Sequence, residues 1–368
     1  MATIRGGRLN GGEVGDLHIR DGLLVAEPTD DDIIDADGLI VSPGLIDIQI
    51  NGGFGHDFTQ DPTTIWQVGE RLPEVGVTAF VPTIVTSPPE ITDLALEVVA
   101  KRRPATYRGA EVLGLHFEGP WISPEMHGAH NVTHIVDPDV DVARSWADSS
   151  LVRIVTLAPE RPGASEVAKI LRDGGVAVSV GHTAADFATA RRAFSDYATL
   201  ATHLFNQMSG LRHRDPGTVG ASLLDADACL LIVDGLHIAD GTLEITWRLL
   251  GSERTILVTD AMAALGLGAG TYPLGDGPIT VGDAGPRTVE GKLAGSVITL
   301  PQALRNLATV IGVDVASTLV CGSANPARVL RLPDRGALQP GMRADVTVFD
   351  DDMGVVATMV GGDIATGR

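Results

Sequence analysis

Four apolar segments of this chain end in residue types that bind metals or transfer protons. VLGLHFEG carries Glu118, GVAVSVGH ends at His182, TLATH ends at His203, and TILVTD ends at Asp260. One carboxylate and two imidazoles match the three protein ligands of catalytic zinc, which leave one coordination position open for water. A further carboxylate beside that water could accept its proton and return it later. Gathered in one place, these residues would form a site for metal-assisted catalysis.

Each of these residues also has an ordinary structural explanation. A single histidine at such a position is more often a hydrogen-bonded core or loop residue, so the ligand hypothesis depends on Glu118, His182 and His203 as a set. Asp260 could cap a helix formed by the following AMAALGL segment. No basic residue follows Asp260 closely enough to form a local ion pair. Its place at the end of an apolar run therefore favours a general base and acid.

The elements that would position these residues follow a regular rhythm. Apolar runs end near residues 50, 83, 118, 158, 181, 203, 233 and 260, and segments with helical periodicity separate most of them. Eight such units predict an α/β fold, a (β/α)8 TIM-like barrel, whose active site lies at the carboxyl ends of its strands. A Gly-, Pro- and Asp-rich stretch from Tyr272 to Lys292 predicts a hairpin inserted after the eighth strand.

The two ends of the chain predict a second, smaller unit. Short strand patterns alternate with Gly and Asp turns before residue 43, and ADVTVFD and GVVATMVGGD near the C-terminus have the same character. We expect them to combine into one small β-sandwich domain, with residues 1–42 as its N-terminal part and 339–368 as its C-terminal part. The metal-dependent barrel would then cover residues 43–338.

Composition narrows the classes of partner. The 368 residues contain no apolar segment near the roughly 20 residues that span a bilayer, and the N-terminus has no secretory pattern. We therefore expect a cytoplasmic protein with no membrane partner. A formal net charge of −20 without a basic face disfavours a nucleic-acid partner. Cys229 and Cys321 lack CxxC spacing and are expected to be small buried residues.

The first predicted barrel strand argues for a single metal ion. LIDIQING places Gln49 and Asn51 on one face of the strand, where many metal-dependent barrel hydrolases carry His-x-His. Amide side chains are poor ligands for transition metals compared with imidazole. The three lysines lie away from strand ends, where a carbamylated bridging lysine would be needed. We expect one divalent cation per subunit, with zinc as the first candidate and iron, cobalt or manganese as alternatives.

Two more histidines leave two interpretations open. His116 shares the inward face of its strand with Glu118, so it could orient a metal ligand or fill a buried layer of the barrel. His56, in the Gly-rich segment NGGFGHDF, could line the mouth of the site or lie on a surface loop.

Longer motifs surround the candidate residues: GPWISPEMHGAHN, VGHTAA, ATHLFNQMSG, VDGLHIA, LVTDAMAA and LAGSVITL. In this order they resemble the N-acetylglucosamine-6-phosphate deacetylase family of the amidohydrolase superfamily. The resemblance runs from SPGLIDIQING to ADVTVFD and covers nearly the whole chain. It implies hydrolysis of the acetamide of N-acetylglucosamine 6-phosphate to glucosamine 6-phosphate and acetate by a metal-activated water. It also implies a homodimer and a sugar phosphate as the small-molecule substrate.

The resemblance assigns roles to individual residues. Glu118, His182 and His203 would hold the cation, Asp260 would be the general base and acid, and His130 would contact the substrate and help to polarise its acetyl carbonyl. The substrate-binding set that it implies is Ala129, His130, Asn206, Gln207, Arg214, Asp234, His237, Leu293, Ala294 and Gly295.

Some of these assignments carry a condition. Arg214 and His237 would bind the phosphate, with at least one of them reached from a neighbouring subunit. Without the resemblance, Arg214 would be interpreted as a surface arginine paired with Asp215. The family often has Ala in place of Gln207, so a backbone contact is implied there. The Gln49 and Asn51 pair resembles the one-metal branch of the family.

Three alternative functions stay open. The chain could deacetylate the galacto epimer of the same sugar phosphate. It could be another amidohydrolase, such as a cyclic-amide hydrolase, although the missing His-x-His and bridging lysine disfavour that class. It could also be a sugar-phosphate-binding regulator built on an inactivated barrel, which the presence of all four candidate residues disfavours.

Overall fold

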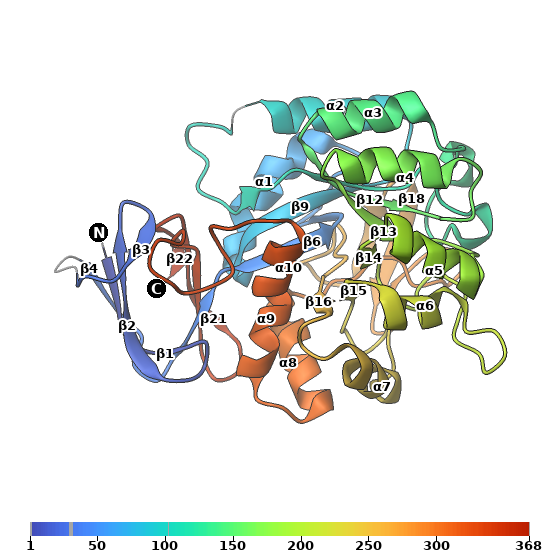
Figure 1. The fold of residues 1–368 in the computed structure, drawn as a ribbon. Helices are drawn as coiled ribbons and strands as arrows, with labels where there is room; N and C mark the ends of the chain where they lie inside the picture. Colours follow the sequence, from blue (N-terminus) through green and yellow to red (C-terminus); the bar gives the residue numbers. More distant parts are fainter. Residues whose placement is uncertain (1, 29–31, 102, 368) are drawn as a thin grey trace.

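A closed parallel barrel forms the centre of the molecule (Figure 1), as the computed structural model describes it for residues 2–28, 32–101 and 103–367. Its strands are β6 (Leu45–Ile50), β9 (Val77–Val85), β11 (Leu115–Glu118), β12 (Val152–Leu157), β13 (Ala177–Val180), β14 (Leu200–Ala201), β15 (Ala228–Leu231) and β16 (Thr255–Leu257), which pair in this order. Short strand β10 (Glu111–Val112) pairs with β9. The predicted TIM-like barrel is confirmed.

The barrel closes between its first and last strands. Asp260 N–H donates a hydrogen bond to Gln49 O at 2.8 Å, and Asn51 N–H donates one to Ala261 O at 2.8 Å. Closure therefore places the residues that follow β6 directly beside those that follow β16.

Both faces of the barrel strands are buried, which explains their nearly continuous apolar sequences. Ile46 and Ile48 of β6 belong to a cluster with residues of β9, β12, β15 and β16, and this cluster fills the barrel interior. Leu45 and Ile50 point the other way, into the larger core between the strands and the surrounding helices.

Helices surround the strands (Figure 1). They are α1 (Ile65–Arg71), α2 (Pro89–Ala100), α3 (Val140–Asp148), α4 (Ala164–Asp173), α5 (Phe187–Asp196), α6 (Gly217–Asp225), α7 (Asp240–Leu250), α8 (Leu300–Ile311), α9 (Leu319–Gly322) and α10 (Ala324–Val329). Within the described ranges no single helix is long and apolar enough to cross a membrane. One bent pair, Leu300–Ile311 with Val315–Val329, meets that test of length and composition.

The two chain ends share one small sheet, as predicted. The N-terminal part gives β1 (Ala2–Leu9), β2 (Val14–Arg20), β3 (Leu23–Val25), β4 (Asp32–Asp35) and β5 (Ile40–Pro43), and the C-terminal part gives β20 (Val346–Phe349), β21 (Val355–Val360) and β22 (Asp363–Gly367). Strands β5 and β20 pair antiparallel, and a bridge between Leu23 and Arg343 folds the sheet over its own apolar core. The boundaries at residues 42 and 339 stay a prediction, and residues 1, 29–31 and 368 of this unit lie outside the described ranges.

The segment after the eighth barrel strand forms a small antiparallel sheet. It consists of β17 (Gly270–Leu274), β18 (Gly277–Gly282) and β19 (Gly285–Arg287). The strand-like segment PITVGD of the predicted hairpin coincides with β18, its second segment RTVEGK begins at the last residue of β19, and β17 was not predicted as a strand. Leu274 and Ile279 of this sheet pack on Met262 and Ala294, so the sheet is fixed to the end of the barrel that carries the candidate residues.

Asp47 is a buried acidic residue of the barrel core, and its protonation links the stability of the fold to pH. Its carboxylate is fully buried and accepts hydrogen bonds from Thr259 Oγ1 at 2.5 Å and from Gln49 N–H at 3.3 Å. Burial raises the pKa of Asp47 to about 7, and the hydrogen bonds only partly oppose this shift. Between about pH 4 and pH 7 the folded protein therefore keeps a proton that the unfolded chain has released. The contribution of Asp47 to stability falls as the pH rises through this window.

We predict that Asp47→Asn removes this dependence while keeping the hydrogen-bonding shape. The free energy of unfolding of the variant relative to the wild type should rise by up to about 4 kcal/mol from pH 4 to pH 7, since one pKa unit corresponds to ~1.4 kcal/mol. Urea unfolding of both proteins across this range measures the difference. Parallel stability curves would show that Asp47 does not hold a proton in the folded state.

Candidate functional site

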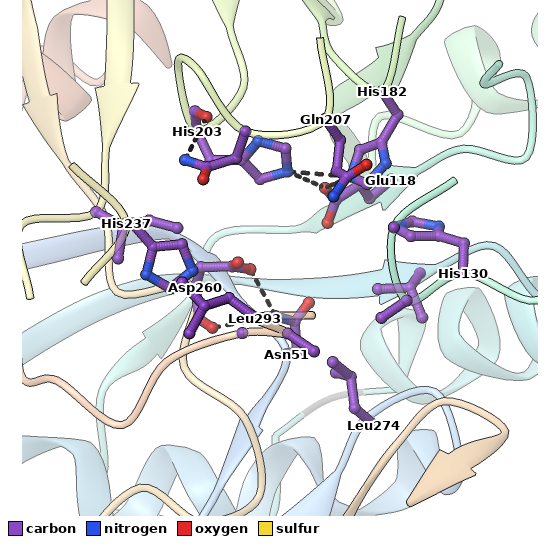
Figure 2. A pocket seen from close by; sticks show the side chains of 17 residues that line it. Asn51, Glu118, His130, His182, His203, Gln207, His237, Asp260, Leu274 and Leu293 are labelled. Atoms are coloured by element: carbon purple, nitrogen blue, oxygen red, sulfur yellow. Dashed lines mark hydrogen bonds and ion pairs between the residues drawn. The ribbon is translucent and has the colours of Figure 1, made fainter. Parts of the chain in front are cut away.

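The carboxyl ends of four barrel strands bring the candidate residues into one pocket (Figure 2). Glu118 ends β11, and His182, His203 and Asp260 lie just beyond β13, β14 and β16. The latter three have φ angles of +47°, +29° and +48°. Residues other than glycine rarely adopt this left-handed conformation, and such strain clusters at functional sites. The chain therefore turns sharply where each of these side chains enters the pocket.

Three donor atoms lie close together. Glu118 Oε1 is 3.1 Å from His182 Nε2 and 3.0 Å from His203 Nε2, and the two nitrogens are 3.0 Å apart. Ligands of one zinc ion at about 2.0–2.1 Å would be roughly 3.3 Å from each other. All three side chains are buried.

The protonation of His182 indicates what these atoms surround. His182 Nδ1 donates to Met126 O at 2.8 Å. A neutral His182 then has no proton on Nε2 and directs a lone pair toward His203 and Glu118. Lone pairs on three adjacent donor atoms repel each other unless a positive charge lies between them. The donor chemistry fits a divalent cation.

His130 offers another nitrogen nearby, since donor atoms of Glu118, His130 and His182 lie within 4.8 Å of one another. The contacts of His203 are much shorter, at 3.0 Å to both Glu118 and His182, so His203 fits the donor cluster better than His130. Burial would raise the pKa of Glu118, but the adjacent imidazoles of His182 and His203 outweigh burial and hold it well below its usual range. Glu118 is therefore an anion.

Asp260 lies beside this donor set, with both amides of the first strand around it. Asn51 Nδ2 donates to Asp260 Oδ1 at 2.7 Å. Gln49 Nε2 lies 3.4 Å from Asp260 Oδ1 and 3.4 Å from both carboxylate oxygens of Glu118. Burial, with a smaller contribution from Glu118, raises the pKa of Asp260 to about 6. A carboxyl group with a pKa near neutrality is suited to proton transfer.

The helix-cap explanation of Asp260 is wrong. Residues 261–269 are all described and contain no helix, and the next regular element is β17. From the sequence, Gln49 and Asn51 were interpreted only as amides in positions where related enzymes carry metal-binding histidines. In the structure both side chains donate hydrogen bonds to Asp260, the candidate acid and base. Their inward-facing spacing at the end of the first strand was the available signal, because the first and eighth strands of a closed barrel are neighbours.

His130 is held by Thr86, which follows β9. The Thr86 backbone N–H donates to His130 Nδ1 at 3.3 Å, and Thr86 Oγ1 lies 2.9 Å from the same nitrogen. The backbone N–H cannot turn away, so Nδ1 accepts and the ring proton lies on Nε2. Burial lowers the pKa of His130 well below its usual value. A neutral His130 therefore offers a fixed Nε2–H donor.

Most of the predicted substrate contacts line the pocket together with the donor set: Ala129, His130, Asn206, Gln207, His237, Leu293, Ala294 and Gly295. Five further residues line the pocket that the sequence did not predict as substrate contacts: Asn51, Val85, Gly128, Ile232 and Leu274.

Two predicted contacts do not line the pocket of this chain. Asp234 instead supports His237, because its Oδ2 accepts from His237 Nδ1 at 2.8 Å and its Oδ1 accepts from the His237 backbone N–H at 2.9 Å. Burial would raise the pKa of Asp234, but the hydrogen bond from His237 outweighs it and the pKa is lowered. Arg214 is exposed in the loop before α6 and contributes nothing to the pocket wall of its own chain.

The two histidines with open interpretations lie outside the pocket wall. His116 is buried between Thr83 Oγ1 at 3.3 Å and Thr156 Oγ1 at 2.8 Å, and burial lowers its pKa to about 4. It fills a layer of the barrel interior and makes no hydrogen bond to a candidate ligand among the described residues. His56 lies in the short strand β8 (His56–Asp57) and is half-buried.

Comparisons with known proteins agree with this architecture. A family model described as the amidohydrolase family matches residues 40–365. The N-acetylglucosamine-6-phosphate deacetylase of Bos taurus is 40% identical over 349 residues, which span 90% of this chain and 84% of that protein. The N-acetylgalactosamine-6-phosphate deacetylase of Escherichia coli O157:H7 is 35% identical, with 95% and 94% of the two chains covered.

A solved structure is similar over the whole chain. It is N-acetyl-D-glucosamine-6-phosphate deacetylase from Mycobacterium smegmatis, a variant with one aspartate replaced by alanine, in complex with N-acetyl-D-glucosamine-6-phosphate. It is 33% identical, covers 99% of this chain and 98% of its own, and gives a TM-score of 0.88.

We predict that removing a donor from the cluster releases the metal. His203→Asn and Glu118→Gln should each lower the bound divalent metal from about one ion per chain to near zero after dialysis, because two remaining donors hold an ion far more weakly. Elemental analysis of the purified proteins measures this. His56→Asn is the matched control and should keep the wild-type content. Full metal occupancy in both cluster variants would exclude this ligand set.

Proposed function

The chain belongs to the amidohydrolase family, and we propose that it hydrolyses the acetamide of N-acetylglucosamine 6-phosphate to glucosamine 6-phosphate and acetate. It is a hydrolytic enzyme by its family and its relatives. The observation that carries the proposal is the approach of Asp260 to the Glu118, His182 and His203 cluster, with Gln49 between the two carboxylates at 3.4 Å from each. The identity of 40% to one deacetylase, and the substrate held in another at 33% identity, support this substrate.

The proposal includes one divalent cation per subunit. Glu118, His182 and His203 would hold it, and such an ion lowers the pKa of a coordinated water and polarises a carbonyl oxygen. One carboxylate and two imidazoles favour zinc, with iron, cobalt and manganese as alternatives. Gln49 and Asn51 supply no imidazole for a second ion, in agreement with a single site.

Asp260 moves the proton in this mechanism. Its carboxylate accepts a proton from the attacking water as the new carbon–oxygen bond forms. It then donates that proton to the amide nitrogen, because the nitrogen must leave as a neutral amine when the carbon–nitrogen bond breaks. The 2.7 Å hydrogen bond from Asn51 keeps one oxygen occupied and leaves the other for this transfer.

His130 stabilises charge on the substrate. Its Nε2–H faces the pocket as a fixed neutral donor, and we assign it to the acetyl oxygen, which becomes negative as the tetrahedral carbon forms. Because Thr86 fixes Nδ1 as an acceptor, the ring does not need to reorganise during the reaction.

The phosphate end of the substrate extends beyond the pocket of one chain. The cavity volume is about 120 Å³, below the ~300–1,000 Å³ of pockets that enclose a drug-sized ligand. His237, supported by Asp234, and the segment Asn206–Gln207 line this cavity and are half-buried, and we assign the sugar phosphate to them. We propose a homodimer in which Arg214 of one subunit reaches the phosphate bound to the other. A cytoplasmic location stays a prediction.

We predict that Asp260→Asn keeps the metal but lowers kcat by roughly 10²–10⁴-fold, the usual contribution of general acid and base catalysis. Asparagine keeps the hydrogen-bonding shape next to Asn51 but cannot carry a proton between water and nitrogen. Acetate release and metal content should be measured on one preparation. A kcat close to the wild-type value with metal bound would remove Asp260 from the mechanism.

We predict that Arg214→Ala weakens binding of the phosphate. KM for N-acetylglucosamine 6-phosphate should rise roughly 10–100-fold, since hydrogen bonds to charged groups contribute about 1.5–3 kcal/mol. The preference over unphosphorylated N-acetylglucosamine should fall equally. Arg212→Ala, which changes an exposed arginine of the same loop, is the control. An unchanged preference in the Arg214 variant, or a monomer in sedimentation analysis, would contradict the intersubunit site.

A panel of N-acetylated hexosamine 6-phosphates tests the substrate itself. We expect the gluco epimer to give the highest kcat/KM, because the larger identity is to a deacetylase of that epimer. Preference for the galacto epimer would favour the function of the relative at 35% identity instead. Binding of sugar phosphate without acetate release would favour the regulator.

A further inference from the structure

Two buried apolar side chains line the pocket, and the proposed reaction does not yet give them a role. Val85 is the last residue of β9 and Leu274 the last of β17, and their side chains are 8% and 6% exposed. Both line the pocket. Figure 2 shows Leu274 across the pocket from His203.

The polar contacts lie on the other side of the barrel. Strands β9 and β14 are the second and sixth of the eight strands, so their ends face each other across the ring. Asn206 and Gln207 follow β14, and His237 follows β15, whereas Val85 ends β9. Val85 therefore lines the side of the pocket that faces Asn206 and Gln207 across the ring.

Hydrogen bonds hold the turn after β17, which carries Leu274 into the pocket, in place. The turn after β17 lies close to Val85, since a Cβ built on Gly275 would be only 3.2 Å from Val85 Cγ2. Gly275 N–H donates to the buried Asp57 Oδ2 at 3.2 Å. The next residue, Asp276, accepts from Asn131 Nδ2 at 2.9 Å. The turn is thus tied both to the β8 segment and to the loop that carries His130.

The acetyl carbon of the substrate has three substituents, an oxygen, a nitrogen and a methyl group, and each can be assigned to a different part of the pocket. The oxygen faces the His130 Nε2–H donor, and the nitrogen faces Asp260, which returns the proton to it. The sugar is attached to the nitrogen and extends toward His237. Because the three bonds of a trigonal carbon lie about 120° apart, the methyl group follows neither the bond to the oxygen nor the bond to the sugar nitrogen, and Val85 and Leu274 line the side of the pocket left for it.

We propose that Val85 and Leu274 form the acyl pocket and limit the hydrolysed group to formyl and acetyl. This inference rests on the proposed deacetylase function and names the residues that set its acyl specificity. Both side chains are more than nine-tenths buried, so each methylene beyond acetyl must displace packed atoms. One methylene in an apolar pocket changes kcat/KM by roughly 10–200-fold.

The test uses N-formyl, N-acetyl, N-propionyl and N-butanoyl glucosamine 6-phosphate. Wild-type kcat/KM should fall roughly 10–200-fold from acetyl to propionyl and further for butanoyl. Leu274→Ala and Val85→Ala each remove carbon atoms from the wall, and each should raise the butanoyl-to-acetyl ratio at least ~10-fold. Since the ratio is measured within one preparation, a smaller fraction of folded protein does not change it.

Ile279→Ala is the matched control. Ile279 is 1% exposed and packs in the same apolar cluster as Leu274, but it does not line the pocket. The variant should therefore leave the ratio unchanged. An equal rise in this control would mean that general loosening of the β17–β19 sheet sets the ratio, and the inference would be wrong.

The outcomes separate the inference from the proposed function. If the wild type releases acetate but both wall variants keep its acyl ratio, the acyl assignment is wrong and the deacetylase function stands. The assignment is also wrong if the wild type accepts butanoyl as well as acetyl. If the wild type hydrolyses no N-acyl hexosamine phosphate, the proposed function fails and the acyl assignment fails with it.

Discussion

The close approach of three donor atoms is the constraint on which the rest of the site depends. Glu118 Oε1 and the Nε2 atoms of His182 and His203 lie 3.0–3.1 Å apart in a buried setting. Such a set is stable only with a positive charge among its members, so the strands must deliver all three to one point. The left-handed backbone at both histidines, at a cost of about 1–3 kcal/mol each, is a consequence of that requirement.

The two amides after the first strand complete the arrangement of charge. Gln49 and Asn51 each direct an NH₂ group to a carboxylate, while Gln49 Oε1 and Asn51 Oδ1 are buried without a hydrogen-bond partner among the described residues. A buried unpaired acceptor costs about 1–3 kcal/mol. The hydrogen bonds that the same amides donate to Glu118 and Asp260 offset this cost, and they hold the two carboxylates apart. Each of the two adjacent carboxylates is thereby held by an amide donor.

The sequence was sufficient for features that depend on local pattern. Continuous apolar runs identified all eight barrel strands, and the residue types at their ends identified the donor set, because position on a barrel strand limits where a side chain can point. Features that depend on the three-dimensional arrangement were missed. The hydrogen bond from Thr86 to His130 joins residues 44 apart in sequence, and Leu274 reaches the pocket from an inserted sheet. Val85 and Leu274 resemble ordinary core residues until the neighbours of each are known.

The pairing of β5 with β20 has a consequence for how the protein is made. Ile40 lies opposite Phe349 and Pro43 opposite Val346, so the N-terminal strands have an unpaired edge until the end of the chain has been synthesised. Exposed strand edges are templates for aggregation, and contacts between distant parts of a chain slow folding. During translation, strand β5 therefore lacks its β20 partner until the ribosome has synthesised all of the barrel strands.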